Sequence, residues 1–390
     1  MAVNEIVINR GEGGLGNPLP GEDYISGIVF YLANANLPSG FTTSDRIKQV
    51  ASIAETEALG ITKGSATNGV LWYHIDQFFK ANPKGILYIG IFDNTSVDLS
   101  KIEDVQTFAN GKIRQIGVFD TTTFATSAVT SLQTSANNLQ NLHQPLNVIY
   151  AGDISGVSDL STLTDLRTLN SKNVSVVIGQ DGDADGKALF VSEGYSITTL
   201  GATLGTISKA AVNESIAWIR AFNIVQGSEH DVPAFANGDL YRDKKSLESG
   251  IDSKGYIYIK NFTGVAGAYH SDSYTSTLVT SDFATIENNR TIDKAVRGIR
   301  TFMLPNLSGP LVVDANSGKL SQDTIDAYKN DSNRALEQMQ IDGEISGYQT
   351  LIDPNQNVLS TGQIVLTVEI VPIGVARKIV INIGFTTKLS

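Results

Sequence analysis

The residues of this chain with the clearest potential for chemistry lie in the acidic segment DGDADG, at positions 181–186. Its carboxylates, Asp181, Asp183 and Asp185, stand where a calcium-binding loop places its first three acidic ligands, and a glycine follows as in that loop. Such a loop also needs a bidentate glutamate near its end, where this sequence has Ser192. The three aspartates are therefore weak candidates for metal ligands, and an acidic turn after a strand is the favoured interpretation.

A glycine-rich segment, GEGGLG at positions 11–16, matches the spacing of a dinucleotide-binding loop. In that motif a helix begins at the loop, so that its free N–H groups face the pyrophosphate. Here Pro18 and Pro20 follow, and they are incompatible with an orderly start of a helix. We therefore predict a flexible glycine loop and no cofactor.

The histidines and the remaining acids give no catalytic signature. His74, His143, His230 and His270 are far apart in the sequence and show no metal-ligand spacing. The segment EHD at 229–231 contains an acid and a base, but neighbouring side chains point in different directions, so a solvated loop is favoured. The chain has no cysteine and no nucleophile-elbow or zincin pattern. We expect a protein without enzymatic activity.

Composition and net charge further restrict the classes of protein to which the chain could belong. With 390 residues, of which 41% are hydrophobic and 18% charged, the chain is long enough for more than one folded unit. Its net charge of −11 argues against nucleic acid as a partner of the surface as a whole. Its beginning lacks a signal-peptide pattern, and its apolar runs are too short to cross a bilayer. We expect a soluble protein made in the cytoplasm, with no direct membrane insertion.

Helical and strand-like patterns alternate over most of the first 225 residues. Near-continuous apolar strands separated by helices predict an α/β fold with a mainly parallel or mixed sheet covered on both faces. The apolar runs lie at 86–92, 113–119, 146–152 and 174–180, and the helical patterns at 44–60, 70–80, 122–143, 160–170 and 209–225.

An aspartate follows each apolar run: Asp93, Asp120, Asp153 and Asp181. Ligands of doubly wound α/β proteins bind at the carboxyl ends of the strands. A ligand-binding protein or enzyme with its site at these aspartates is therefore one hypothesis. Aspartate after a strand is also common turn and cap chemistry, and no nucleophile, base or phosphate loop accompanies these four.

The last third of the chain predicts two long helices, at 288–304 and 321–340, the second with Ser321 as its cap. A basic stripe, Arg290, Lys294 and Arg297, runs along the first helix opposite its apolar face. By itself the stripe indicates an ordinary solvated face; alternatively it docks on an acidic partner surface.

The chain ends on two strand-like segments. Apolar residues alternate along both of them and predict strands with one buried face. A free, apolar edge strand is an aggregation hazard unless a partner covers it. The alternating residues are Ile364, Leu366, Val368 and Ile370, then Ile379, Ile381, Ile383 and Phe385; Ile6 and Ile8 share one face of a shorter strand near the amino end.

Taken in order, these C-terminal features resemble the contractile tail sheath proteins of bacteriophages and related injection machines. The resemblance rests on the arginine-bearing helix, the long helix that ends in a small-residue turn (323–348), and two strands joined through Pro372 (362–385). Segments 254–277 and 13–31 are similar to other parts of the sheath family. The chain departs from the family pattern at Arg377 and Lys378, where an acidic residue and phenylalanine are usual.

The resemblance implies a structural subunit that polymerises as helically stacked rings around an inner tail tube and contracts to drive the tube through a cell envelope. It implies a strand arm and linker at 1–22, an α/β core at 23–285, a helical part at 286–362 and a strand arm at 363–390. Strands from the ends of one subunit would complete a sheet in another, and we expect the last strand alone to leave its own subunit.

The implied partners are copies of the same chain, the tube protein, and baseplate and terminator proteins. The implied location is a virion tail or phage-tail-like particle assembled in the bacterial cytoplasm. Within this picture Arg290, Lys294 and Arg297 become candidates for the tube-facing contact. A capsid- or tube-type particle protein is a further alternative, although such proteins usually have a β-dominated core.

Overall fold

The computed structural model describes residues 21–315, 317–381, 383 and 385. Within these residues the chain forms a seven-stranded sheet in the order β2-β3-β1-β4-β5-β6-β9, and all neighbours run parallel except the edge strand β2. The predicted α/β class with a mainly parallel sheet is confirmed. The strands are β1 (Ile25–Tyr31), β2 (Ile47–Val50), β3 (Ile86–Phe92), β4 (Gln115–Thr123), β5 (Asn147–Asp153), β6 (Val174–Val177) and β9 (Tyr256–Ile257).

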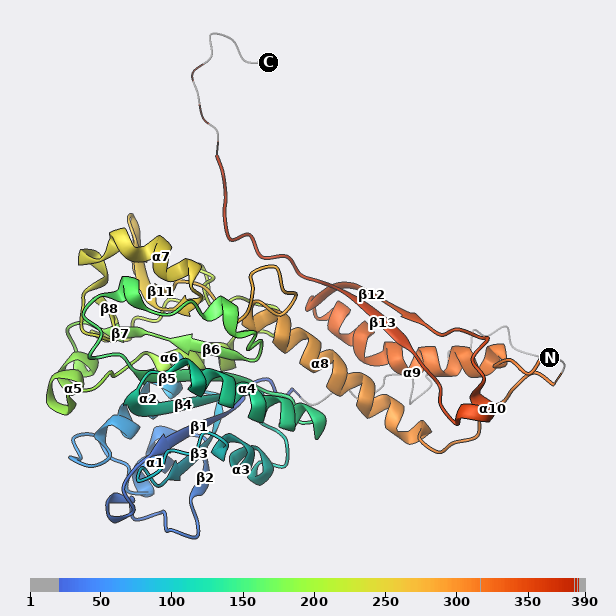
Figure 1. Ribbon diagram of the computed structural model, residues 1–390, viewed down its shortest axis with the longest axis horizontal. Helices are drawn as coiled ribbons and strands as arrows, with labels where there is room; N and C mark the ends of the chain where they lie inside the picture. The colour runs from blue at the N-terminus through green and yellow to red at the C-terminus, as the bar shows by residue number, and fades with distance from the viewer. Residues whose placement is uncertain (1–20, 316, 382, 384, 386–390) are drawn as a thin grey trace, which may run out of the picture.

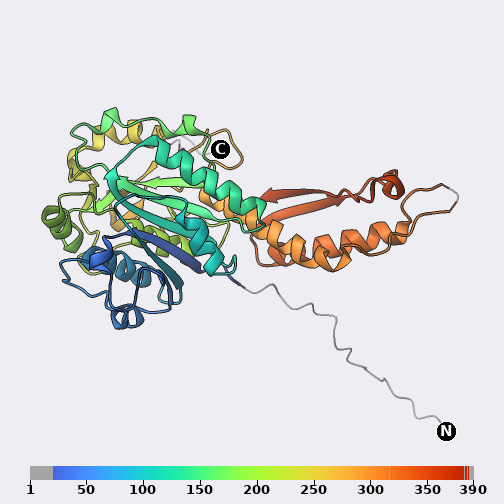
Figure 2. The ribbon, with the colours of Figure 1, turned by 60° about the horizontal axis from the view of Figure 1, so that its bottom comes forward.

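Helices cover both faces of this sheet (Figures 1 and 2). Helices α3 (Lys101–Phe108) and α4 (Thr126–Asn141) pack on one face, and α2 (Gly69–Ala81) and α6 (Leu200–Lys209) on the other. Both faces of the sheet are apolar because successive side chains of a strand point to opposite faces. In β1, Val29 packs on the side of α3 and α4, and Phe30 on the side of α2 and α6.

Two glycines allow α6 to lie very close to α2. A Cβ on Gly201 would stand 2.0 Å from the carbonyl oxygen of His74, and one on Gly205 would stand 2.5 Å from that of Phe78. Any side chain at these positions would force the helices apart. The close packing therefore requires glycine at two positions of α6, one in its first turn and one in its interior, although glycine is otherwise unfavourable in a helix.

Shorter elements surround the sheet. Strand β7 (Gly179–Asp181) pairs with β8 (Pro233–Phe235), and β10 (Ile259–Phe262) pairs with β11 (Val265–His270). The remaining helices of this part are α1 (Ile53–Ala58), α5 (Asp185–Glu193) and α7 (Glu248–Ser253). None of the described helices combines the length and the apolar character that crossing a membrane requires.

The C-terminal part projects from this α/β body as an elongated unit (Figures 1 and 2). Helix α8 (Ile286–Met303) leads out of the body, and α9 (Gln322–Ile341) packs along it. Strands β12 (Ile345–Leu351) and β13 (Thr367–Pro372) then form an antiparallel pair. A separate small core, which includes Ala295, Leu336, Met339 and Ile345, holds the helices and the strand pair together.

The predicted cap of α9 is confirmed, but three predicted helices are wrong in part or whole. Residues 44–60 form the edge strand β2 and then the short α1, because Ser52 caps a new helix and Ile47 and Val50 pair with β3. Residues 210–225 form turns and irregular segments, and the helix lies before them, as α6, which ends at Lys209. Residues 160–170 form two separate 3₁₀ turns, capped by Asp159 and Asp165.

Candidate functional site

Three of the aspartates at the strand ends accept hydrogen bonds from their own turns and from neighbouring elements. In β4, Asp120 accepts hydrogen bonds from the N–H and hydroxyl of Thr122, at 2.9 and 2.8 Å, and from the Tyr150 hydroxyl at 3.0 Å. Asp153 accepts from the N–H groups of Ser155 and Ser196, at 2.8 and 2.9 Å. Asp93 accepts from Asn34 and Thr95. Turn contacts and hydrogen bonds to neighbouring elements account for these three carboxylates, and the hypothesis of a shared ligand site there is not favoured.

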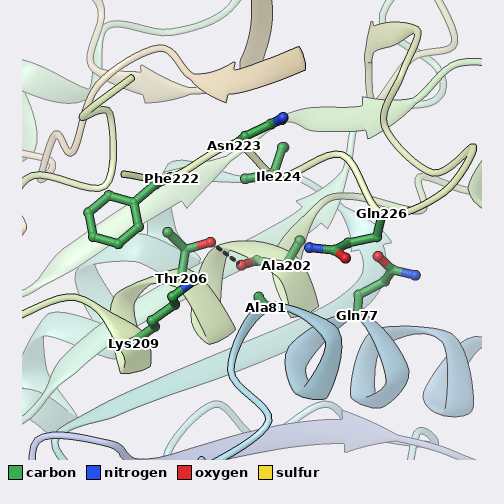
Figure 3. A pocket seen from close by; sticks show the side chains of 9 residues that line it. All are labelled: Gln77, Ala81, Ala202, Thr206, Lys209, Phe222, Asn223, Ile224 and Gln226. Atoms are coloured by element: carbon green, nitrogen blue, oxygen red, sulfur yellow. Dashed lines mark hydrogen bonds between the residues drawn. The ribbon is translucent and has the colours of Figure 1, made fainter. Parts of the chain in front are cut away.

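A small cavity lies between α2 and α6 (Figure 3). Its volume of about 20 Å³ is room for a single water molecule. Figure 3 shows Thr206 donating to the carbonyl oxygen of Ala202 one turn earlier, at 2.8 Å, within the wall of the cavity. The other residues that line the cavity are Gln77, Ala81, Lys209, Phe222, Asn223, Ile224 and Gln226. A cavity of this size does not admit an organic substrate.

The acidic segment 181–186 is not organised as a calcium loop. Asp181 is buried, Asp183 is exposed, and Asp185 forms an ion pair with Lys63 at 2.6 Å. Among the described residues, the metal-ligand atoms of these three aspartates do not gather in one group. Asp181 instead lies beside Glu229 and His230.

The prediction of a solvated loop at 229–231 is wrong for its first two residues. Glu229 is 5% exposed and His230 is 0% exposed. His230 has a φ of +63°, a left-handed conformation that breaks the usual alternation of neighbouring side chains. Burial lowers the pKa of His230 to about 4, so its imidazole is neutral at neutral pH.

The basic stripe of α8 faces inward. Arg290 is buried and donates to the carbonyl oxygens of Ala210 and Ala211, both at 3.1 Å, and to that of Asp23 at 3.3 Å. Lys294 forms ion pairs with the Asp23 carboxylate at 3.0 Å and with Glu344 at 2.5 Å. Asp23 precedes β1, and Glu344 precedes β12.

Asp23, Lys294, Arg297 and Glu344 form a charged junction between the α/β body and the C-terminal unit, and their opposite charges stabilise one another. Arg297 also pairs with Asp23, at 3.1 Å. Burial by itself would raise the pKa of Asp23, but Lys294, Arg290 and Arg297 together hold it below its usual value. Burial lowers the pKa of Arg297 to about 10 and raises that of Asp293 to about 6.

The solvated stripe expected from the sequence is therefore wrong: these side chains tie the α/β body to the C-terminal unit. A tube-facing role of Arg290, Lys294 and Arg297 stays a prediction. The positive charges on which that prediction was based bind groups of the same subunit. Sequence spacing shows which residues share a helix face, but it does not show that Asp23 and Glu344 cover that face.

The two strand-like segments at the chain end do not pair with each other in the described residues. The first forms β13, with Ile370 opposite Tyr348 of β12 and Val368 opposite Thr350. Ile364 and Leu366, just before β13, are partly buried against a second small core. In the described part of the chain the sheet contains only β12 and β13, so their outer edges are open.

The second segment extends from the α/β body, and its apolar side chains are not buried against other described residues. Its side chains are largely exposed, with fractions of 78% at Ile379, 80% at Ile381 and 95% at Ile383, and Phe385 is fully exposed. Figure 1 shows this part of the chain extending away from the other elements. Ile6 and Ile8, the expected strand at the amino end, lie outside the described residues.

Arg377 anchors the root of this exposed segment. Its Nε donates to both carboxylate oxygens of Asp272, at 3.0 and 3.1 Å, and its Nη2 donates to Glu287 at the start of α8. Asp272 is 6% exposed and Glu287 2% exposed. In the sequence Arg377 differs from other residues only as a departure from a family pattern, because its two partners lie 105 and 90 residues away.

Comparison with solved structures shows that this fold is shared along the whole chain. A chain of the cryo-EM structure of the anti-feeding prophage (AFP) helical sheath in the contracted state is similar, with a TM-score of 0.61 and 14% identity. A chain of the six-fold symmetrised AFP baseplate is similar, with a TM-score of 0.60 and 13% identity. Each alignment covers 100% of both chains. At these identities the likeness shows the fold.

Sequence comparison gives the family. No curated protein matches this chain. The model of the DUF2586 N-terminal domain matches residues 3–274, and that of the DUF2586 C-terminal domain matches residues 282–390. The chain therefore belongs to the DUF2586 family.

Proposed function

We propose that this protein is a structural subunit of a contractile tail sheath, which polymerises as stacked rings around an inner tube and contracts to drive the tube through a cell envelope. Two observations carry the proposal: the exposed apolar side chains of Ile379, Ile381, Ile383 and Phe385, and a sheet that contains only two strands in the described part of the chain. The fold shared with the contracted AFP sheath supports it.

Strand addition between subunits explains both features. A two-stranded sheet is marginal by itself, and here α9 packs against β12 while the outer strand edges stay open. A strand donated by a neighbouring copy would pair with an open edge through main-chain hydrogen bonds, and its alternating side chains would set the register. The donated strand would be 379–385 from the carboxyl end, with the amino-terminal arm as a second donor.

The anchors of the arms suit such a polymer. Arg377 fixes the point at which the last strand leaves, and the junction at Asp23, Lys294 and Glu344 fixes the C-terminal unit to the body. A contracting sheath needs subunits that move as bodies while the strands between them stay paired. The partners would be copies of this chain, a tube protein, and baseplate and terminator proteins, in a tail-like particle assembled in the bacterial cytoplasm.

Electron microscopy of the full-length protein at high concentration tests the proposal. We expect hollow helical tubes or stacked rings. A truncated chain that ends at Lys378 keeps Arg377 but loses the exposed segment, so it should unfold at the same denaturant concentration as the full chain and form no polymer. A full-length protein that stays monomeric, or a truncated one that polymerises equally well, would contradict the proposal.

A matched pair of lysine substitutions distinguishes loss of the donated strand from a general effect of added surface charge on polymerisation. Ile381→Lys lies on the proposed donated strand, and Val191→Lys lies on α5, where the valine is 70% exposed. We expect the first to prevent polymerisation and the second to leave it intact.

A baseplate subunit is the second candidate, because the TM-score to the AFP baseplate chain, 0.60, is nearly the same as that to the sheath chain, 0.61. Such a subunit would form closed rings that do not stack. Closed rings without helical tubes, across the same protein concentrations, would favour this candidate over the sheath.

A further inference from the structure

A buried group of three side chains lies where β7 ends and α5 begins. A carboxylate oxygen of Asp181, one of Glu229 and a ring nitrogen of His230 all lie within 4.8 Å of one another. All three residues are buried. Neither assembly nor the packing of the central sheet explains why two acids and an imidazole gather here.

The orientation of the carboxylates is fixed by the protein. Each carboxylate oxygen has two lone pairs, so Asp181 Oδ1 and both Glu229 oxygens, with one donor each, retain an acceptor position. Hydrogen bonds of this kind orient metal ligands from outside. The donors to Asp181 are the N–H groups of His230 at 2.9 Å, Ala184 at 2.6 Å and Lys187 at 3.2 Å; the donors to Glu229 are the N–H of Asp185 at 2.9 Å and the hydroxyl of Tyr73 at 3.1 Å.

His230 supplies an independent observation. Both of its ring nitrogens are buried and have no hydrogen-bond partner in the described part of the chain. Buried polar atoms in proteins are nearly always paired, and a buried imidazole beside two carboxylates is a ready metal ligand. The nearby cation Lys63 pairs with Asp185 instead, and no ion pair of the described residues involves Asp181 or Glu229.

We propose that Asp181, Glu229 and His230 bind a zinc ion. One imidazole and two carboxylates, without a thiolate, form a ligand set that zinc accepts, whereas calcium needs six or more oxygen ligands. The ion would neutralise the two buried carboxylates and give the imidazole a partner. It would link the segment before β8 to the start of α5 and so stabilise that part of the fold.

Zinc content and affinity test this proposal. The protein, without a polyhistidine tag, is unfolded with chelator and refolded with ZnCl₂, and bound zinc is measured by elemental analysis and by competition with a chromogenic chelator. We expect one zinc per chain and a higher unfolding temperature than in the zinc-free protein. His230→Gln should weaken zinc binding by about 100-fold or more, since loss of an outer-shell partner alone costs 10–100-fold.

Two control variants separate this site from the other histidines. His143→Gln, at an exposed position, and His74→Phe, at a buried position among aromatic rings, should both retain one zinc per chain. If His230→Gln does not fold, X-ray absorption of the zinc-loaded natural protein should show scattering from one imidazole. No bound zinc after refolding, equal binding by His230→Gln, or an absorption spectrum without imidazole would overturn the proposal.

Discussion

The guanidinium Nε of Arg377 donates to both carboxylate oxygens of Asp272, at 3.0 and 3.1 Å. This contact holds the chain to the α/β body immediately before its exposed apolar segment begins. At the other end of the described chain, Asp23 is held in the same manner by Lys294 and Arg297 of α8. Both proposed arms therefore start from ion-paired residues close to α8, and each arm has a fixed point of departure.

Removal of the Arg377 side chain should destabilise the body as well as assembly. In Arg377→Ala the buried carboxylates of Asp272 and Glu287 lose their cation. We expect this loss to lower the free energy of unfolding by about 1–2 kcal/mol, a modest value because water reaches the Arg377 side chain, which is 36% exposed. Denaturant unfolding at neutral pH measures the change. Lys378→Ala, at the next and exposed position, is the control and should leave the free energy unchanged.

Substitution of Gly201 tests the close approach of α6 to α2. Alanine usually favours a helix over glycine, but here its Cβ would meet the carbonyl oxygen of His74. We expect Gly201→Ala to lower the free energy of unfolding by about 2–3 kcal/mol, because a backbone atom cannot move aside as a side chain can. Gly156→Ala, which has open space around it, should change it by less than about 0.5 kcal/mol. Equal effects would show that the helices do not pack in this way.

The buried His74 should make stability depend on pH. Burial lowers its pKa to about 3, and nearby His230 adds to the effect, whereas in the unfolded chain the pKa is near 6.5. Between these values the unfolded state binds a proton that the folded state does not, so this contribution to stability is complete above pH 6.5 and falls as the pH is lowered toward 3.

His74→Phe isolates this contribution, since phenylalanine suits the rings of Phe30 and Phe119 around the site. The free energy of unfolding, measured from pH 7 to pH 4.5, should fall less steeply with decreasing pH in the variant. The difference in slope should correspond to about one proton fewer taken up on unfolding. An unchanged slope would mean that His74 is protonated in the folded protein.

Charge reversal on α8 distinguishes a buried junction from a solvated face. Lys294→Glu would place a carboxylate against Asp23 and Glu344, and we expect a clearly lower melting temperature of the isolated subunit. Arg300→Glu reverses a charge at an exposed position of the same helix and should change the melting temperature little. If both variants melt like the natural protein, the junction does not hold the two parts together.

Local patterns in the sequence predict much of the architecture. Four apolar runs located β3, β4, β5 and the β6–β7 region, since a strand buried on both faces must be apolar along its length. The spacing of α8 and α9 and the cap at Ser321 were also visible, because helix faces and caps depend on residues three or four apart. These features are local.

The contacts that each of these segments makes depend on the folding of the whole chain. The sequence pattern did not predict helix α6, because its glycines and threonines favour a helix only where α2 packs against them. The stripe on α8 became a buried junction because Asp23, far away in the sequence, covers it. His230 and Asp181 meet because β7 pairs with β8, which brings distant segments together. Contacts between segments far apart in the chain leave no periodic trace in the sequence, and the candidate sites of this protein consist of such contacts.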